Sequence, residues 1–301
     1  MLRKHSSLEQ LLRLTKTATN TYTNASQFNI PFRGRGLFGG TMAAQATAAA
    51  LLSQESPAWK PISLHCQFLK AVTQDPLTYV VEDLKSGKNY QTKQINLFQN
   101  DKLAFTAVCG IQRTKLQGSA GNLDGQLSHH RSAPCVGPLI DQNTAFETWA
   151  KKTDNSARLG ELIEHYAAEP LEWKLPENMF DLEKVSSSEQ SAPVSDRTLW
   201  YQVRPKVPVP DPVYQWALVA YISDYFYLST NMRLNMRPMF TTKFSVSLDH
   251  TIYFENPITD GWTTYGVKSL VAGEGRSIMT GEMFQGPDLV ATTFQQGLSV
   301  V

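Results

Sequence analysis

DPVYQWALVAYISDYFYLST, residues 211–230, is the stretch around which the rest of this chain can be interpreted. Asp211 and Pro212 are typical of the N-cap and first turn of a helix. Apolar residues then follow at the i, i+3, i+4 spacing of a helix and cover nearly every face. The stretch therefore predicts a buried helix over 211–230, and its many polar interruptions argue against a membrane span.

One carboxylate, Asp224, stands near the end of this apolar run. At helical spacing it shares a face with Ala220 and Tyr221, so an ionised carboxylate there carries a desolvation cost unless hydrogen bonds support it. Two interpretations follow. Asp224 is either a structural partner of Ser223 or of a neighbouring strand, or it is a working residue of a site.

The composition is that of a globular chain with room for two domains: 301 residues, 42% hydrophobic and 18% charged. A net charge of +1 gives no field for nucleic acid, so we expect no nucleic-acid partner. The three cysteines are widely spaced and predict neither a disulfide framework nor a zinc site, which favours a reducing compartment. We expect 129–131, His-His-Arg, to be a solvated loop, because no acid or cysteine stands at ligand spacing.

Two further helix starts can be identified in the first fifty residues. Ser7 followed by Gln10 is a capping box, which predicts a short helix through Leu14; a weak organelle-targeting segment in the basic N-terminus is the alternative. Gly39 and Gly40 open a small-residue helix, and its N-terminus could bind a carbonyl oxygen or a phosphate. The alternative is that these glycines only allow a turn and close packing.

Period-two patterns begin at Pro61 and return after residue 243. The first predicts about four strands with turns at 87–88 and 100–101. Residues 68 and 254, 98–99 and 284–285, and 103 and 289 match at an offset of 186. One helix-plus-meander unit is thus used twice. We expect a first repeat at 1–113, a linker at 114–165 and a second repeat at 166–301.

We also expect a loop at 117–138, strands at 171–180 and 200–206, and a mobile Ser-rich connection at 186–195.

Three motifs in this order carry a family resemblance: FGGTMAAQA, then AYISD, then SVSLDHTIYF with FQQG. They resemble the type II acyl-CoA thioesterases, which include the bacterial enzyme and its fungal and animal peroxisomal relatives. The resemblance implies an α+β double hot-dog, that is, two tandem helix-wrapped antiparallel sheets. It also implies hydrolysis of fatty acyl-CoA to fatty acid and coenzyme A without cofactor or metal, and a homodimer or higher homo-oligomer.

The resemblance also implies catalytic residues: Asp224, Ser247 two residues before Asp-His, and Gln295 on the last strand. In the first half Gln45 stands where an acid might have been and Cys109 is the repeat equivalent of Gln295. We therefore expect one active site per chain.

The expected chemistry is water activated by Asp224 as general base, with a covalent anhydride on the same carboxylate as a second mechanism. Gly39, Gly40 and His65 are candidate substrate-binding residues, with an internal hydrogen bond as the alternative role of His65.

Several readings stay open from the sequence. A non-catalytic acyl-CoA-binding module has the same fold, and a thioesterase of a fungal secondary-metabolite pathway has the same chemistry. A hot-dog hydratase would need an Asp facing a His, whereas Asp249 and His250 are adjacent on a strand and point to opposite faces. The absence of G-x-S-x-G disfavours a serine hydrolase.

The expected compartment is the peroxisome by resemblance, with the cytosol as the alternative, because the chain ends in LSVV rather than an SKL-type signal.

Overall fold

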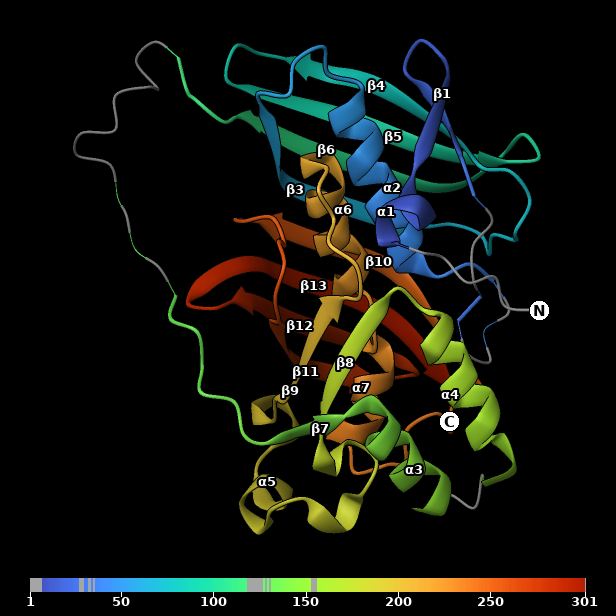
Figure 1. The fold of residues 1–301 in the computed structure, drawn as a ribbon, viewed down its shortest axis with the longest axis vertical. Coiled ribbons are helices and arrows are strands. Elements are labelled where there is room, and N and C mark those ends of the chain that lie inside the picture. Colours follow the sequence, from blue (N-terminus) through green and yellow to red (C-terminus); the bar gives the residue numbers. More distant parts are fainter. Residues whose placement is uncertain are drawn as a thin grey trace.

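The computed structural model describes residues 7–26, 30–31, 34, 36–117, 127, 129, 131–152 and 156–300. The predictions for the basic N-terminus, for part of the 117–138 loop, for residue 130 and for the last residue lie outside these ranges. Within them, no helix is long and apolar enough to cross a membrane. Figure 1 shows the blue and blue-green strands of the first repeat above the orange and red strands of the second.

The first repeat consists of α1 (Leu8–Leu12), β1 (Leu14–Ala18), β2 (Thr21–Asn24), α2 (Gly39–Leu52), β3 (Trp59–Phe68), β4 (Thr78–Ser86), β5 (Tyr90–Gln99) and β6 (Lys102–Arg113). The predicted linker and the first part of the predicted second repeat contain β7 (Leu139–Asp141), α3 (Gln142–Lys152), η2 (Ser156–Arg158), α4 (Leu159–Ala168), β8 (Leu171–Pro176), η3 (Glu177–Met179), η4 (Leu182–Lys184), α5 (Ser187–Ser191) and η5 (Val194–Asp196). The rest of the second repeat contains β9 (Leu199–Pro205), α6 (Pro212–Ser223), α7 (Tyr227–Leu234), β10 (Phe244–Phe254), β11 (Thr263–Gly273), β12 (Arg276–Gln285) and β13 (Asp288–Val300).

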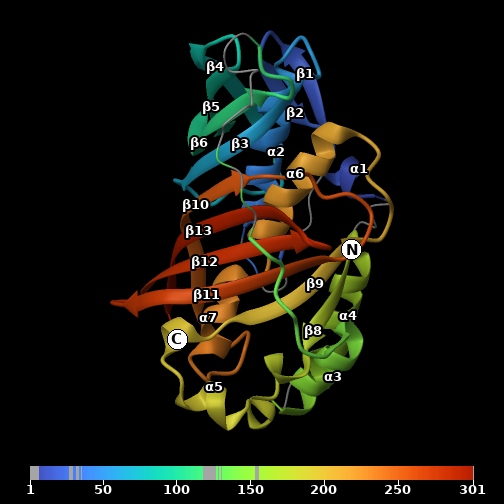
Figure 2. The ribbon, with the colours of Figure 1, turned by 90° about the vertical axis from the view of Figure 1, so that its left-hand side faces the viewer.

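The strands of the described chain form one 13-stranded antiparallel sheet, in the order β1-β2-β4-β5-β6-β3-β10-β13-β12-β11-β9-β8-β7. Outward from the centre, where β3 pairs with β10, six strands on each side, these two included, follow in equivalent order, and β7 is an additional strand at one edge. In that pair His65 lies opposite Thr251, its own repeat equivalent 186 positions later. A pseudo-two-fold axis therefore passes between these two residues, and the two predicted sheets are joined edge to edge (Figure 2).

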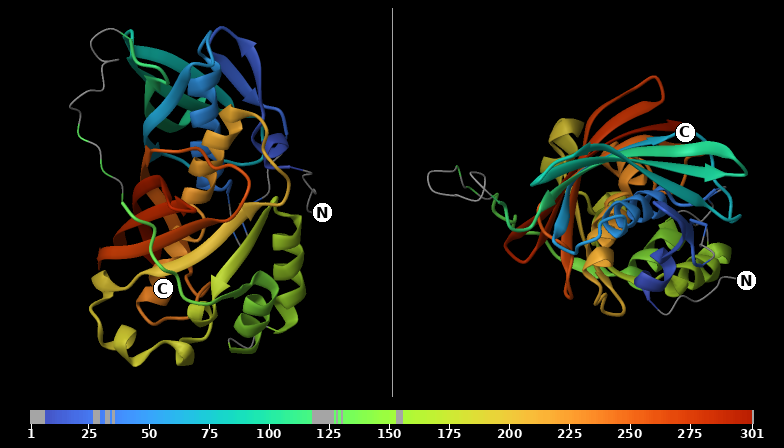
Figure 3. Two further views of the ribbon diagram at one scale, coloured as in Figure 1. Left: turned by 60° about the vertical axis from the view of Figure 1, so that its left-hand side comes forward. Right: turned by 90° about the horizontal axis from the view of Figure 1, so that it is seen from above.

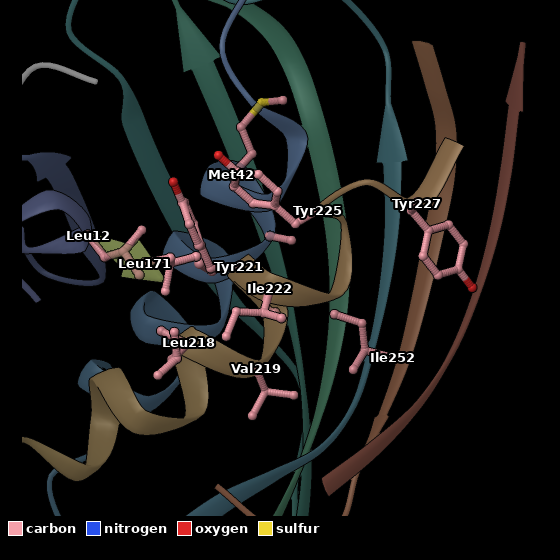
Figure 4. Close-up of a cluster of buried hydrophobic side chains, with 14 of the residues drawn as sticks. Leu12, Met42, Leu171, Leu218, Val219, Tyr221, Ile222, Tyr225, Tyr227 and Ile252 are labelled. Atoms are coloured by element: carbon pink, nitrogen blue, oxygen red, sulfur yellow. The ribbon is translucent and has the colours of Figure 1, made fainter. Parts of the chain in front are cut away.

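The two long apolar helices, α2 and α6, lie on one side of the curved sheet and pack against each other (Figure 3). Both are buried on nearly all faces, which the sequence predicted for α6. Small residues make the close approach possible: a Cβ added at Gly40 would lie 2.6 Å from the Tyr221 carbonyl oxygen. Figure 4 shows the apolar side chains of α6, among them Leu218, Val219 and Ile222, in this core.

The predicted helix over 211–230 is interrupted, which corrects the sequence-based boundary. Asp211 caps the start as expected, but α6 ends at Ser223 and Asp224 is its C-cap. Phe226 then adopts a left-handed backbone conformation with φ of 57°, which is rare for a bulky residue. Its ring stacks on Tyr166 at 5.8 Å, and this tertiary packing holds the break that periodicity alone does not reveal.

Two predicted connections contain more structure than the sequence suggested. The predicted linker at 114–165 includes α3 and most of α4, which pack on each other next to β8. The Ser-rich segment at 186–195 includes α5, which is held by a bidentate ion pair between buried Arg233 and Glu189. Long-range pairing of this kind cannot be predicted from local composition.

Other local predictions agree with the structure. The hydroxyl of Ser7 accepts a hydrogen bond from the Gln10 amide at 3.2 Å, and the helix it caps ends at Leu12 rather than Leu14. At the turn over 100–101 both residues have positive φ. The predicted strand over 171–180 ends at Pro176, where a short 3-10 turn follows.

Candidate active site

Three side chains from distant parts of the chain converge beside the end of α6. The Gln295 amide nitrogen donates to the Asp224 carboxylate at 2.6 Å and to the Ser247 hydroxyl oxygen at 2.7 Å. The Ser247 hydroxyl lies 3.4 Å from the same carboxylate oxygen, to which it donates. The structure thus brings together the three residues that the resemblance implies as catalytic.

A β-bulge in β10 gives Ser247 its orientation. Ser247 pairs with Gly297 and Asp249 pairs with Gln296, so Leu248 is an extra residue without a partner of its own in β13. Such a bulge shifts the alternation of side chains by one position. Ser247 therefore faces the helices together with His250, which pairs with Gln295. Without the bulge, strand alternation would turn Ser247 to the opposite face.

Asp224 is a carboxylate that burial makes hard to ionise. It is only 8% exposed, and desolvation raises its pKa from 3.8 to about 6. Hydrogen bonds from Gln295, from the Gly40 amide and from Ser247 oppose this rise. The carboxylate therefore lies at the N-terminus of α2, where the helix dipole also favours a negative charge. At neutral pH it is a base with a raised proton affinity.

The two glycines of α2 define the floor of the site. Gly40 donates its amide to the Asp224 carboxylate, and a Cβ added at Gly39 would lie 2.7 Å from Asp224 Oδ2. Close packing and a hydrogen bond to the Asp224 carboxylate are enough to explain why glycine stands at both positions. Their predicted contact with substrate stays a prediction.

His65 lies away from these residues. It is exposed on β3, on the face opposite to buried Cys66, and its Nδ1 lies 3.3 Å from the Thr251 hydroxyl. The structure therefore supports the hydrogen-bonded alternative and does not bring His65 to Asp224. By alternation it is Cys66, directly opposite His250 across the β3–β10 pair, that faces the helices.

His250 lies next to the site, and the sequence did not predict its contacts. Its Nε2 lies 2.8 Å from the Ser223 hydroxyl, which itself donates to the Ala220 carbonyl at 2.9 Å. The imidazole is therefore the donor, and burial lowers its pKa to about 3, so it is neutral. Tyr265 also donates to the Ser223 carbonyl at 2.7 Å. Both contacts fix the residue just before Asp224.

Asp249 faces away from the helices, as strand alternation predicts, and its carboxylate accepts a hydrogen bond from the Gln296 amide at 3.2 Å. The period-two pattern of the strand is the sequence feature from which the inward direction of the His250 side chain could have been predicted. Its partner on α6 could not be deduced, because that partner comes from another element.

The equivalent place in the first repeat has different chemistry. Pro61 stands at the repeat position of Ser247, and Cys109 stands at that of Gln295. Burial raises the pKa of the Cys109 thiol to about 12. The Gln45 side chain donates to the Leu12 carbonyl and accepts from the Tyr79 hydroxyl, so its polar groups are satisfied within the core.

The group of Asp224, Ser247 and Gln295 also has a free acceptor. Gln295 Oε1 is buried and has no hydrogen-bond partner among the described residues. It lies on the same amide that binds Asp224 and Ser247. A base, a hydroxyl and a free acceptor within one hydrogen-bonded group are suited to orienting a water molecule. In the described part of the chain no three His, Cys, Asp or Glu side chains gather as metal ligands would.

Comparisons with known proteins show which proteins this chain is similar to. A family model described as acyl-CoA thioesterase N-terminal domain matches residues 29–112, and one described as acyl-CoA thioesterase matches 179–298. The peroxisomal acyl-coenzyme A thioester hydrolase 1 of Saccharomyces cerevisiae is 26% identical, over 98% of this chain and 95% of its own length. Human acyl-coenzyme A thioesterase 8 is 28% identical, over 88% and 82% respectively.

Solved structures confirm the fold. An acyl-CoA thioesterase II from Mycobacterium marinum superposes with a TM-score of 0.71 at 23% identity and covers 97% of this chain and 96% of its own. A protein with a hot dog fold from Alicyclobacillus acidocaldarius has a TM-score of 0.65 at 17% identity, with 97% of each chain covered. The expected α+β double hot-dog is thereby confirmed.

Proposed function

Since this chain belongs to the acyl-CoA thioesterase family, we propose that it hydrolyses fatty acyl-CoA to a free fatty acid and coenzyme A. The observation that carries the proposal is the hydrogen-bonded group of Asp224, Ser247 and Gln295. A carboxylate with a raised pKa, held between a hydroxyl and an amide, is equipped to activate water near neutral pH.

The proposed reaction proceeds in two steps. Asp224 takes a proton from a water molecule held by Ser247 and Gln295, and the water oxygen attacks the thioester carbonyl carbon. The tetrahedral oxyanion then collapses, the carbon–sulfur bond breaks, and the coenzyme A thiolate leaves and takes up the proton from Asp224. Each oxyanion donor contributes about 3 kcal/mol in other enzymes, and we propose that backbone amides at a helix N-terminus supply it here. No cofactor or metal takes part in this scheme.

Thiol release from a panel of acyl-CoAs, from short to long and including branched chains, tests the proposal. We expect release from at least one chain length, and the panel then identifies the substrate class. Saturable binding without release on every chain length would instead support the non-catalytic acyl-CoA-binding module.

The compartment and the pathway are part of the same proposal. We place the protein in fatty acid metabolism in the peroxisome, supported by the name of the yeast relative, with the cytosol as the alternative. Fluorescence microscopy of the tagged chain, with the tag at the N-terminus, distinguishes the two. Diffuse cytosolic signal would contradict a peroxisomal location.

We also propose that the protein is a homodimer or higher homo-oligomer that associates through the outer face of its sheet. Three exposed apolar side chains support this: Tyr253, Ile278 and Phe294 alternate with inward-facing residues on β10, β12 and β13. Sedimentation of the wild type and of Phe294→Glu tests it. We expect an oligomer that the substitution weakens, and a monomeric wild type would contradict the proposal.

A further inference from the structure

A second buried carboxylate lies outside the catalytic group. Glu169 stands between α4 and β8 and is only 4% exposed. The Tyr221 hydroxyl donates to its Oε2 at 3.2 Å, and the Tyr225 hydroxyl also hydrogen-bonds to it. Along the chain these two tyrosines flank Asp224. Glu169 therefore reaches the turn that carries the catalytic carboxylate without touching that carboxylate.

The two tyrosines also contact the other side of the site. Their rings pack edge-on against Phe38, with centroids 5.2 Å away for Tyr221 and 4.9 Å away for Tyr225. Phe38 directly precedes Gly39 and is the N-cap of α2. Figure 4 shows both tyrosines among the buried side chains around the end of α6. A shift of either tyrosine would therefore move Asp224 relative to the α2 amide that binds it.

The surroundings of Glu169 allow its charge to change near neutral pH. Burial raises its pKa from 4.5 to about 7, against the hydrogen bond from Tyr221, the charge of Lys206 and the hydrogen bond from Tyr225. His165 of α4 lies 3.7 Å away, and burial lowers the pKa of its imidazole, so it is neutral there. Tyr166 of the same helix is also a neighbour, and burial raises the pKa of its phenol, which therefore stays protonated.

We propose that Glu169 is a positioning residue for the thioesterase reaction: through Tyr221 and Tyr225 its carboxylate holds the turn that presents Asp224 to the water molecule. The inference rests on the proposed function. An ionised carboxylate accepts hydrogen bonds from both phenols, whereas a protonated one carries a proton of its own and competes with them as a donor. The turn is thus held most firmly when Glu169 is charged.

The pH dependence of kcat tests this in Glu169→Gln, which keeps the size and removes the charge. We expect the wild-type rate to rise in two steps, near pH 6 with Asp224 and near pH 7 with Glu169. The variant should show only the lower step, with kcat at pH 8 reduced about tenfold, the scale of one lost hydrogen bond, and KM changed by less than about twofold.

Asp181→Asn is the matched control. Asp181 is another buried carboxylate, but it pairs with Lys152 at 3.2 Å and caps a turn away from α6. We expect it to keep both steps. Two steps in Glu169→Gln, or a wild-type kcat, would overturn the inference.

A second variant covers the case in which Glu169→Gln does not fold. The double change Tyr221→Phe and Tyr225→Phe keeps the rings and removes the hydroxyls, so the upper step should vanish in the same way; its persistence would overturn the inference.

If the wild type releases no thiol from any acyl-CoA, the proposed function is wrong, and the role of Glu169 then needs a test that does not depend on activity. The inference is then decided by carbon-13 NMR of the Asp224 carboxyl. A second inflection near pH 7 that is lost in the double variant supports it, and a single inflection in the wild type overturns it.

Discussion

At the scale of a single residue, Asp224 affects both the stability of the fold and the proposed chemistry, and the two effects oppose each other. Its folded pKa of about 6 lies above the ordinary 3.8, so the folded state binds this proton more tightly than the unfolded state. The corresponding stability is fully present below pH 3.8 and is lost as the pH rises through 6. At neutral pH the ionised carboxylate therefore destabilises the fold, and it is this ionised form that we propose as the base.

Asp224→Asn should raise the free energy of unfolding at pH 8. The upper limit is about 3 kcal/mol, because one pKa unit corresponds to about 1.4 kcal/mol. The gain should disappear at about pH 3.5, where the wild-type carboxyl is protonated in both states. Urea unfolding at both pH values measures it. Equal stability of the two proteins at pH 8 would show that the buried, ionised Asp224 carboxylate does not destabilise the fold.

Ser247 offers a matched pair of substitutions. Ser247→Ala removes the hydroxyl between Gln295 and Asp224 and should lower kcat by about 10²-fold, in the range of positioning and acid–base effects. Ser247→Thr keeps the hydroxyl and should stay within about fivefold of wild type. Steady-state thiol release measures both. If Ala and Thr behave alike, the hydroxyl does not orient the reacting water.

The sequence predicted the identity of this trio only through the resemblance of three motifs. From the residues alone, Ser247 was indistinguishable from a solvent-facing strand serine, because the bulge at Leu248 depends on pairing with β13. Glu169 carried no signal at all. Its partners Tyr221 and Tyr225 lie more than fifty positions away, so only the folded chain shows the contact.

At the scale of elements, the site depends on where two helices end. The C-terminus of α6 and the N-terminus of α2 meet at the Asp224–Gly40 contact. Sequence periodicity predicted both helices and the glycines that open α2. It could not predict that α6 stops at Ser223, because the apolar pattern continues and the break depends on Phe226 packing against Tyr166.

Gly40→Ala tests this contact between helix ends. The added Cβ would lie 2.5 Å from the Phe38 ring and 2.6 Å from the Tyr221 carbonyl oxygen. We expect a loss of about 1–3 kcal/mol from overpacking, together with a lower kcat. Gly160→Ala in α4 is the control, since no atom lies within 4 Å of its added Cβ. A Gly40 variant as stable and active as that control would contradict the close approach.

At the scale of the whole molecule, the chain is a duplicated unit, and we propose that its second half carries the chemistry. The offset of 186 predicted equivalent strands well: β5 and β12 match at both ends. The edge-to-edge union through β3 and β10 was not predictable, because periodicity reports which face of a strand is buried and not which strand lies beside it. The helices of the 114–165 segment were missed for lack of clear periodicity.

Duplication with divergence predicts one substrate site per chain. Pro61 and Cys109 replace the hydroxyl and the amide in the first half, so we expect the second half alone to orient the water. Isothermal titration with a non-hydrolysable acyl-CoA thioether should give one molecule bound per chain. Two equivalent sites per chain would contradict the division of roles between the repeats.

The most direct test of the account is coenzyme A release by wild type and Asp224→Asn, measured side by side on the acyl-CoA panel at pH 8. We expect release by the wild type and a loss of about 10² or more in the variant, whose amide cannot accept the proton from water. A variant as fast as the wild type, or a wild type silent on every chain length, would contradict the assignment of Asp224 as the catalytic base.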